Sequence, residues 1–193
     1  MKYVQKEFSS TFEEKKSKFH AFLAPYSKFN EVMERLKNEH PKARHFVYAY
    51  RYLNEFDQII ENSSDDGEPK GTSGKPCLNV LAGNDLINTF VIVVRYFGGV
   101  KLGTGGLVRA YSDAVNSVIN IAQLETYQKL EIKKLQCEYN ELSKLEYLIK
   151  NSNIDILGKE FNLKVELLLQ STKGNFEQFE KELPLGIKLE IKI

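Results

Sequence analysis

A glycine-rich segment at residues 95–109 contains the residue types and spacing best suited to chemistry. It reads Arg-Tyr-Phe-Gly-Gly-Val-Lys-Leu-Gly-Thr-Gly-Gly-Leu-Val-Arg. An apolar run precedes it and apolar residues follow at helical spacing, so the pattern predicts a strand, a loop and an amphipathic helix. Glycine permits positive φ and close approach. A helix that begins in such a loop presents free N–H groups and the positive end of its dipole. A phosphate or carboxylate therefore suits this loop.

The candidate anion- or nucleic-acid-binding residues are the loop residues and the basic side chains expected beside them. They are Arg95, Gly98, Gly99, Lys101, Gly103, Gly105, Gly106, Arg109, Lys16 and His45. The glycine spacing matches neither a P-loop nor a dinucleotide-binding fingerprint. A tight turn that needs glycine only for backbone conformation and packing explains the pattern equally well, so both interpretations stay open.

An acidic segment is the second candidate site, with Asp65, Asp66, Glu68 and Lys70 within six residues. Its carboxylates could hold Mg²⁺ beside a phosphate, which would give a phosphoryl-transfer site together with the glycine loop. A solvated loop with Asx-turns and a helix cap is the interpretation we favour. The sequence does not decide whether this segment binds a metal ion.

Nucleophilic chemistry has weaker support. Cys77 follows Pro76 at a predicted helix start, where a thiolate would be stabilised, and a pair with His45 is conceivable. No spacing rule supports that pair, and we favour buried, satisfied side chains for Cys77, His45 and His20. We assign no catalytic residue and predict no cofactor.

The composition limits the function classes. The chain has 193 residues, a net charge of +1 and two cysteines without zinc or disulfide spacing. Basic and acidic residues are nearly balanced in both halves, so neither half is a basic nucleic-acid-binding domain, although a local basic patch remains open. The chain shows no membrane span and no signal peptide, and we expect a cytoplasmic protein.

The elements that must position these residues fall into two groups. For the first, we predict strands at 16–24, 44–53, 58–61 and 88–97 and helices at 28–40, 76–81 and 107–122. Ser27 is the expected cap of the first helix, and residues 62–75 are expected to be loop. We place the domain boundary after residue 126.

Residues 127–193 predict a β-α-β-β-α-β order, which is a ferredoxin-like plan. In its first strand, at 130–139, the apolar alternation shifts at Lys133-Lys134, which predicts a β-bulge. Gly158 opens a predicted turn at 158–162. The uncovered sheet face should carry mixed charges without an aromatic platform for RNA bases, namely Lys164, Glu166, Lys188, Glu190 and Lys192.

The first two thirds of the chain resemble the IMPACT/YigZ family. The resemblance rests on five stretches: Lys15-Lys16-Ser17-Lys18-Phe19, residues 43–51, residues 65–72 (Asp-Asp-Gly-Glu-Pro-Lys-Gly-Thr), Gly74-Lys75-Pro76 and residues 94–111. The final third is similar to bacterial members by its order of elements. Ser73, Cys77 and Val94 depart from the alanine, methionine and threonine that the pattern favours.

The resemblance implies an α+β chain, with a ribosomal protein S5 domain 2-like N-terminal domain and a ferredoxin-like C-terminal domain. Together these resemble the C-terminal domains of elongation factor G. Eukaryotic members regulate translation initiation by binding an activator of an eIF2 kinase, partly through an additional N-terminal module. This sequence starts at the shared domain, so we do not expect that activity here.

Three functional hypotheses follow. The first is a non-catalytic, translation-associated regulatory protein that contacts RNA, the ribosome or a translation-related protein through the glycine-rich loop. The second is an enzyme that acts on a phosphorylated or carboxylated small molecule at a site formed by Asp65, Asp66, Glu68 and the glycine loop. The third is a protein-binding adaptor. The oligomeric state is not predicted.

Overall fold

The computed structural model describes residues 1–184, 186–187 and 189–191. The chain divides into two compact units, Met1–Tyr127 and Gln128–Ile193. The division falls one residue after the boundary that we place from the sequence. Each unit has a hydrophobic core of its own, and each is therefore described by itself.

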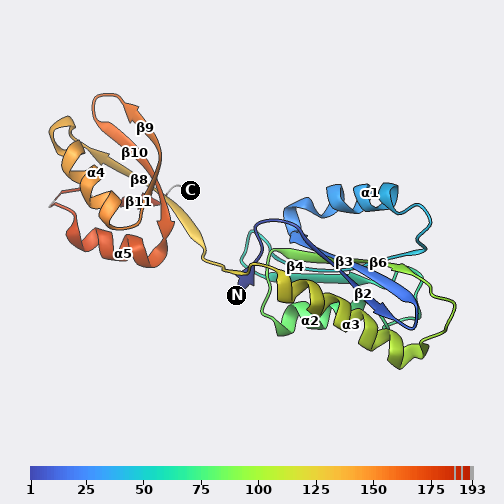
Figure 1. Cartoon of the computed structure of the whole chain (residues 1–193). Coiled ribbons are helices and arrows are strands. Elements are labelled where there is room, and N and C mark those ends of the chain that lie inside the picture. The colour runs from blue at the N-terminus through green and yellow to red at the C-terminus, as the bar shows by residue number, and fades with distance from the viewer. Residues whose placement is uncertain (185, 188, 192–193) are drawn as a thin grey trace. The chain divides into compact units, whose positions relative to one another are not determined.

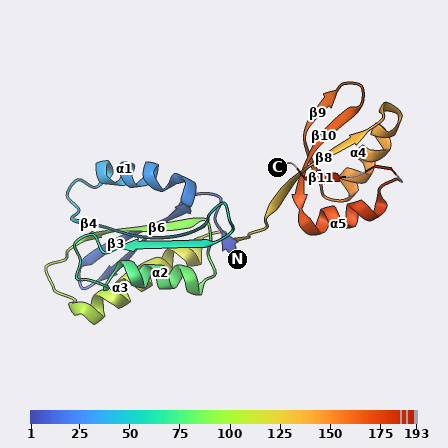
Figure 2. The ribbon, with the colours of Figure 1, turned by 180° about the vertical axis from the view of Figure 1, so that it is seen from behind.

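The first unit contains a five-stranded antiparallel sheet. In chain order its elements are β1 (Lys2–Tyr3), β2 (Phe8–Glu14), β3 (Ser17–Pro25), α1 (Phe29–Glu39), β4 (His45–Leu53), β5 (Ile59–Ser64), α2 (Gly74–Gly83), β6 (Thr89–Tyr96), α3 (Gly103–Ile121) and β7 (Glu125–Thr126). The sheet order is β2-β3-β6-β4-β5, and the short β1 pairs with β7. Figure 1 shows α1 on one face of the sheet and α2 and α3 on the other, and Figure 2 shows the same layers from behind.

The central strand β6 is apolar on both sides because both of its faces are covered. Phe90, Ile92 and Val94 pack toward α1, whereas Val91 and Val93 pack in the core beneath α2 and α3. A continuous apolar run is typical of a strand that is buried on both faces. This strand ends at Tyr96 and leads directly into the glycine-rich segment.

Several boundaries differ from the sequence-based prediction. The third helix starts at Gly103 rather than at residue 107, so three of the candidate glycines lie in its first turn. Because glycine has a low helix propensity, the sequence pattern did not predict this first turn. Strand β5 extends to Ser64 into the expected loop. Ser27 does not cap α1, because it lies in a 3₁₀ turn, Tyr26–Lys28, and no side chain caps the helix that follows.

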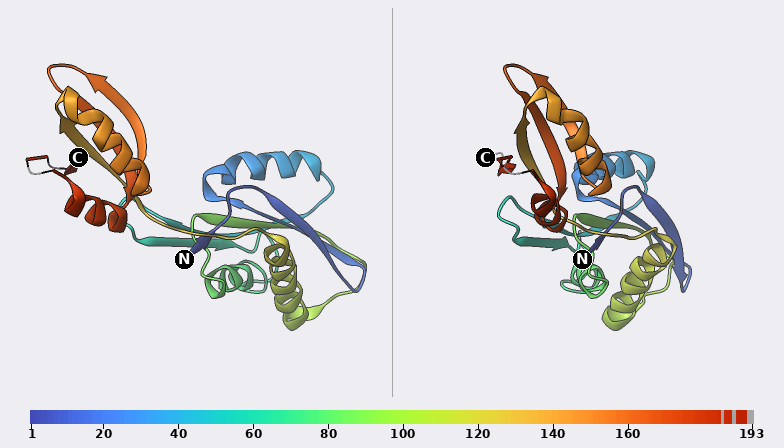
Figure 3. Two further views of the ribbon diagram at one scale, coloured as in Figure 1. Left: turned by 60° about the vertical axis from the view of Figure 1, so that its left-hand side comes forward. Right: turned by 90° about the vertical axis from the view of Figure 1, so that its left-hand side faces the viewer.

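The second unit contains β8 (Leu130–Cys137), α4 (Leu142–Asn151), β9 (Asp155–Phe161), β10 (Val165–Thr172), α5 (Lys173–Glu182) and β11 (Leu189–Ile191). The sheet order β11-β8-β10-β9 and the β-α-β-β-α-β connectivity confirm the ferredoxin-like prediction. Buried residues of α4 and α5, including Leu145 and Phe176, share one core with the strands, so both helices cover the same sheet face. Figure 3 shows this unit from two further sides.

Two predictions for the second unit are wrong. The strand β8 pairs with β10 in continuous register, and the irregularity lies instead between β9 and β10 at Leu168/Leu169. The apolar alternation shifts in β8 because Lys133 faces the core, where its ammonium lies over the Phe176 ring and pairs with Glu180. Gly158 lies within β9 rather than in a turn.

The uncovered face of the second sheet is only partly as expected. Glu166 and Glu190 lie on strands there, next to Lys134. Lys164 precedes β10, and its ammonium pairs with Glu138. Lys188 and Lys192 lie outside the described residues. Exposed Leu130, Ile132 and Leu157 make this face more apolar than predicted. Within the described residues, no helix is long and apolar enough to cross a membrane.

Candidate functional site

Several of the segments that carry the family resemblance meet at one end of the five-stranded sheet, where β6 ends. They include residues 15–19, 65–72 and 94–111, together with the start of β4. His45, the first residue of β4, lies opposite Arg95 near the end of β6. Lys15 and Lys16 form the turn between β2 and β3, and both have positive φ. That turn packs against Gly98. The sheet register therefore brings together segments that are far apart in the sequence.

Arg95 is buried, and its guanidinium is bonded within the fold. Its Nη1 donates a hydrogen bond to Glu68 Oε1 at 2.6 Å, and its side chain is 7% exposed. The Tyr111 hydroxyl on α3 donates to the same oxygen at 2.9 Å. The guanidinium also lies over the Phe19 ring. Burial, followed by the Glu68 charge, raises the pKa of Tyr111. Nη1 of Arg95 is thus bonded within the fold at the base of the loop, and a contact of Arg95 with an external anion stays a prediction.

Asp65 caps the second helix, although it precedes that helix by nine positions in the sequence. Its carboxylate accepts hydrogen bonds from the backbone N–H groups of Gly71, Ser73 and Gly74 and from the Ser73 hydroxyl. Partial burial alone would raise the pKa of Asp65, but these donors together hold it below its ordinary value. The helix α2 begins at Gly74, so the carboxylate accepts from the first free N–H of the helix and from the residue that precedes it.

Asp66 joins the same segment to β4. Its carboxylate accepts a hydrogen bond from the backbone N–H of Phe46 at 2.6 Å. Its carbonyl oxygen lies 2.8 Å from His45 Nδ1, which donates the hydrogen bond because a carbonyl can only accept. His45 is half-buried, whereas Lys70 is exposed. The structure thus uses one nitrogen of the candidate His45 within the fold.

The three acidic candidates of this segment are all bonded within the fold. The carboxylates of Asp65, Asp66 and Glu68 each bond to a different part of the fold. No group of three or more His, Cys, Asp or Glu side chains among the described residues could hold a metal ion. Cys77 is fully buried, and that burial raises the pKa of its thiol, so the fold does not favour a thiolate there.

The glycine-rich segment approaches its neighbours closely at one position. A Cβ at Gly98 would lie 2.0 Å from the carbonyl carbon of Lys16, and the Gly98 N–H donates to the Ser17 hydroxyl. Gly99 and Gly103 have positive φ, of 85° and 72°. A Cβ at Gly105 would meet no other atom within 4 Å, whereas one at Gly106 would lie 3.0 Å from Leu102 Cβ. Several of these glycines are therefore required for close packing or for a positive φ.

The remaining basic candidates are exposed around this segment. Lys16, Lys101 and Arg109 are all exposed. The backbone N–H groups of residues 99–101 donate to no acceptor in the described part of the chain, and the first turn of α3 adds its own free N–H groups. The loop thus combines free backbone donors, a helix N-terminus and exposed cationic side chains.

A small groove beside this surface was not predicted from the sequence. It has a volume of about 130 Å³ and lies between β2, its turn and the start of α3. The groove is lined by Phe12, Glu14, Lys15, Leu102, Gly106, Arg109, Ala110 and Asp113. A prediction of the strand β2 would have indicated this groove, because its pairing with β3 places Glu14 and Lys15 near α3.

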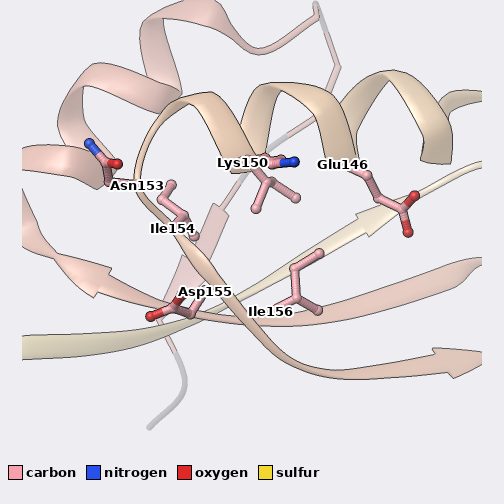
Figure 4. A pocket seen from close by; sticks show the side chains of 7 residues that line it. Glu146, Lys150, Asn153, Ile154, Asp155 and Ile156 are labelled. Atoms are coloured by element: carbon pink, nitrogen blue, oxygen red, sulfur yellow. The ribbon is translucent and has the colours of Figure 1, made fainter.

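A second hollow lies in the ferredoxin-like unit, between α4 and β9. Its volume is about 390 Å³. Figure 4 shows Glu146 and Lys150 on the helix and Asp155 and Ile156 on the strand that face it. The Glu146 carboxylate pairs with Lys159, so part of the rim is already bonded within the fold.

The chain has two domains, and each of them matches a known protein-family model. The model of the Impact N-terminal domain matches residues 15–119, and a domain of unknown function, DUF1949, matches residues 135–184. The chain belongs to the IMPACT family, and the predicted α+β fold class is confirmed.

Relatives match across both units. An IMPACT family member of Haemophilus influenzae is 36% identical over 186 residues, which cover 94% of this chain and 90% of the relative. The IMPACT family member YvyE of Bacillus subtilis is 36% identical over 185 residues, covering 92% and 83%. A crystal structure titled as that of a hypothetical protein aligns with a TM-score of 0.71 at 31% identity, covering 100% of this chain and 97% of that one.

Proposed function

We propose that this protein is a non-catalytic, cytoplasmic regulator of translation that contacts RNA, on or off the ribosome, through the surface around the glycine-rich segment. The observation that carries the proposal is the exposure of Lys16, Lys101 and Arg109 around a loop with free backbone N–H groups. Membership of the IMPACT family supports the link to translation.

The chemistry of this surface fits a phosphate backbone. Lysine and arginine side chains and helix N-termini are common phosphate contacts in nucleic-acid complexes. The cations come from three segments: the β2–β3 turn, the glycine loop and α3. The buried pair of Glu68 and Arg95 fixes the base of the loop without occupying its outer side. The surface is therefore held in shape while its donors stay exposed.

The net charge of +1 limits the kind of contact. A local cluster of a few cations gives a moderate, salt-dependent attraction rather than the strong non-specific binding of a basic domain. Regulation by contact with a large RNA particle suits such a surface, because several weak contacts can act together on one particle.

Co-sedimentation with purified bacterial ribosomes tests the proposal. The full chain should pellet with ribosomes at about 50 mM potassium chloride, and the bound fraction should fall steeply by about 500 mM. A variant with Lys101→Gln and Arg109→Gln should bind less, whereas Lys28→Gln with Lys37→Gln, on and beside α1 on the other sheet face, should bind as the parent does. No co-sedimentation at low salt, together with no binding to ribosomal RNA, would exclude the proposed contact.

A further inference from the structure

The groove between β2 and α3 contains an unusual set of charges for its size. Lys15 and Arg109 line it together with Glu14 and Asp113. None of these four side chains forms an ion pair or a side-chain hydrogen bond with any described residue. Two cationic donors and two carboxylate acceptors thus line one small groove without bonding to one another.

The volume of the groove limits what can occupy it. About 130 Å³ is well below the roughly 300–1,000 Å³ of common small-molecule pockets. It corresponds to about four water molecules at roughly 30 Å³ each. A single flat ring system or one side chain fits this space, and a whole nucleotide does not.

The floor of the groove is apolar. Phe12, Leu102 and Ala110 line it, and Gly106 adds no side chain. A Cβ at Gly106 would lie 3.0 Å from Leu102 Cβ, so the absence of a side chain at Gly106 leaves space in the groove. An apolar floor of this kind accommodates the face of a planar ring, on which aromatic and aliphatic side chains pack favourably.

The formal charges in the lining balance, so the groove offers no net attraction to a charged occupant. A cationic side chain would meet Lys15 and Arg109, and an anionic one would meet Glu14 and Asp113. A neutral ring with acceptors on one edge and donors on another satisfies both pairs. Guanine offers O6 and N7 as acceptors for a lysine or arginine. Its N1–H and N2 amino group are donors on the Watson–Crick edge, which single-stranded RNA exposes. Adenine and uracil offer fewer donors to a pair of carboxylates.

We propose that this groove binds one guanine base of a single-stranded RNA segment. The inference rests on the proposed RNA contact and adds a base preference to it. The groove is continuous with the phosphate-contacting surface, because Leu102 and Gly106 belong to the glycine-rich segment and Lys15 is adjacent to Lys16. An RNA strand whose phosphates lie along Lys16 and Lys101 can place a base against Phe12.

Fluorescence anisotropy with short labelled RNAs tests the proposal. The full chain is titrated with a uridine oligomer and with the same oligomer carrying one central guanine, adenine or cytosine. The guanine oligomer should bind about tenfold more tightly than the others. Asp113→Asn should reduce this preference to less than about threefold, because it replaces one acceptor by an amide. Glu34→Gln, on α1, should leave the preference unchanged.

The outcomes separate this site from the broader function. Equal binding of all four oligomers, or a guanine preference that survives Asp113→Asn, overturns the base site and leaves the RNA contact standing. No binding of any oligomer at low salt overturns the RNA contact and the base site with it. A circular dichroism spectrum and a thermal transition matched to the parent show that Asp113→Asn is folded, so that a lost preference reports on the groove.

Discussion

Glu68 and Arg95 form a buried ion pair in which Arg95 Nη1 lies 2.6 Å from Glu68 Oε1. The two residues belong to the acidic segment and to the glycine-rich segment, which are the two most distinctive stretches of the sequence. The Tyr111 hydroxyl donates to the same carboxylate oxygen, so α3 is joined to both. Each of the two stretches therefore supplies one half of a contact at the end of the sheet.

Removal of one partner of this pair should be costly. Arg95→Met leaves the Glu68 carboxylate buried without its cation and should lower the free energy of unfolding by about 3–5 kcal/mol. The double variant Glu68→Leu with Arg95→Met should lose less than the sum of the two single variants, because no charge is then left unpaired. Urea denaturation of the three variants measures this coupling. Strictly additive losses would show that the pair does not act as a unit.

Tyr111→Phe tests the second donor to Glu68. It removes a buried hydroxyl that donates at 2.9 Å and should lower the free energy of unfolding by about 1.5–3 kcal/mol, the range for a hydrogen bond to a charged group. Ser112→Ala, the adjacent helix position with a local hydroxyl contact to Val108, should change it by less than about 0.5 kcal/mol. Equal losses would contradict the role assigned to the buried hydroxyl.

Two glycines of the glycine-rich segment should differ sharply in their tolerance of alanine. Gly98→Ala places a Cβ against the Lys16 backbone, which cannot withdraw as the end of a side chain can. It should lower the free energy of unfolding by more than about 2 kcal/mol, as overpacking does. Gly105→Ala meets no atom and should be neutral or stabilise α3 by up to about 1 kcal/mol. Thermal unfolding of both variants checks the order, and similar midpoints would refute it.

The cap that Asp65 provides should depend on pH. Its pKa is held below the ordinary value of 3.8 in the folded state, so its stabilisation is present above about pH 4 and is lost as the pH falls through the folded-state pKa. Asp65→Ala should lower the free energy of unfolding by about 1–2 kcal/mol at pH 7. The difference in the free energy of unfolding between parent and variant should shrink as the pH falls below 3.8. A difference that stays constant with pH would contradict the capping role of the carboxylate.

His20 should make the protein less stable in mild acid. Burial, with the nearby His40 and Lys18, lowers the pKa of His20 from 6.5. The unfolded chain therefore binds a proton more readily, and the free energy of unfolding should fall as the pH drops below 6.5. His20→Asn, which can keep a hydrogen bond to Thr11, should show a weaker dependence between pH 7.5 and 5.5. An unchanged slope would exclude His20 as the cause.

The arrangement of elements was accessible from the sequence because its patterns are local. The apolar run of β6, the stripe of Val32 and Leu36 on α1, and the alternation of Val165, Leu167 and Leu169 each predict their element, and all are found. The predicted β-bulge failed for a long-range reason. Lys133 reaches Glu180 and Phe176 on α5, and no pattern within β8 shows that contact.

The candidate site was only partly accessible for the same reason. The sequence marked the glycine loop and the acidic segment, but it gave no measure of the distance between them. Strand pairing across 50 residues places His45 beside Arg95 and brings Glu68 within reach. The mainly polar edge strand β2 was not recognised, so the groove that it forms with α3 was missed.

The salt dependence of RNA binding tests the central claim most directly. The parent chain and a variant with Lys16→Gln, Lys101→Gln and Arg109→Gln are titrated with single-stranded RNA across a potassium chloride series. Loss of three phosphate contacts should reduce the slope of log K against log salt by about 2. A control with Lys28→Gln, Lys37→Gln and Lys144→Gln carries the same charge change at residues outside the glycine-rich segment and should keep the parent slope. Equal slopes for all three proteins would contradict the claim that this surface contacts RNA.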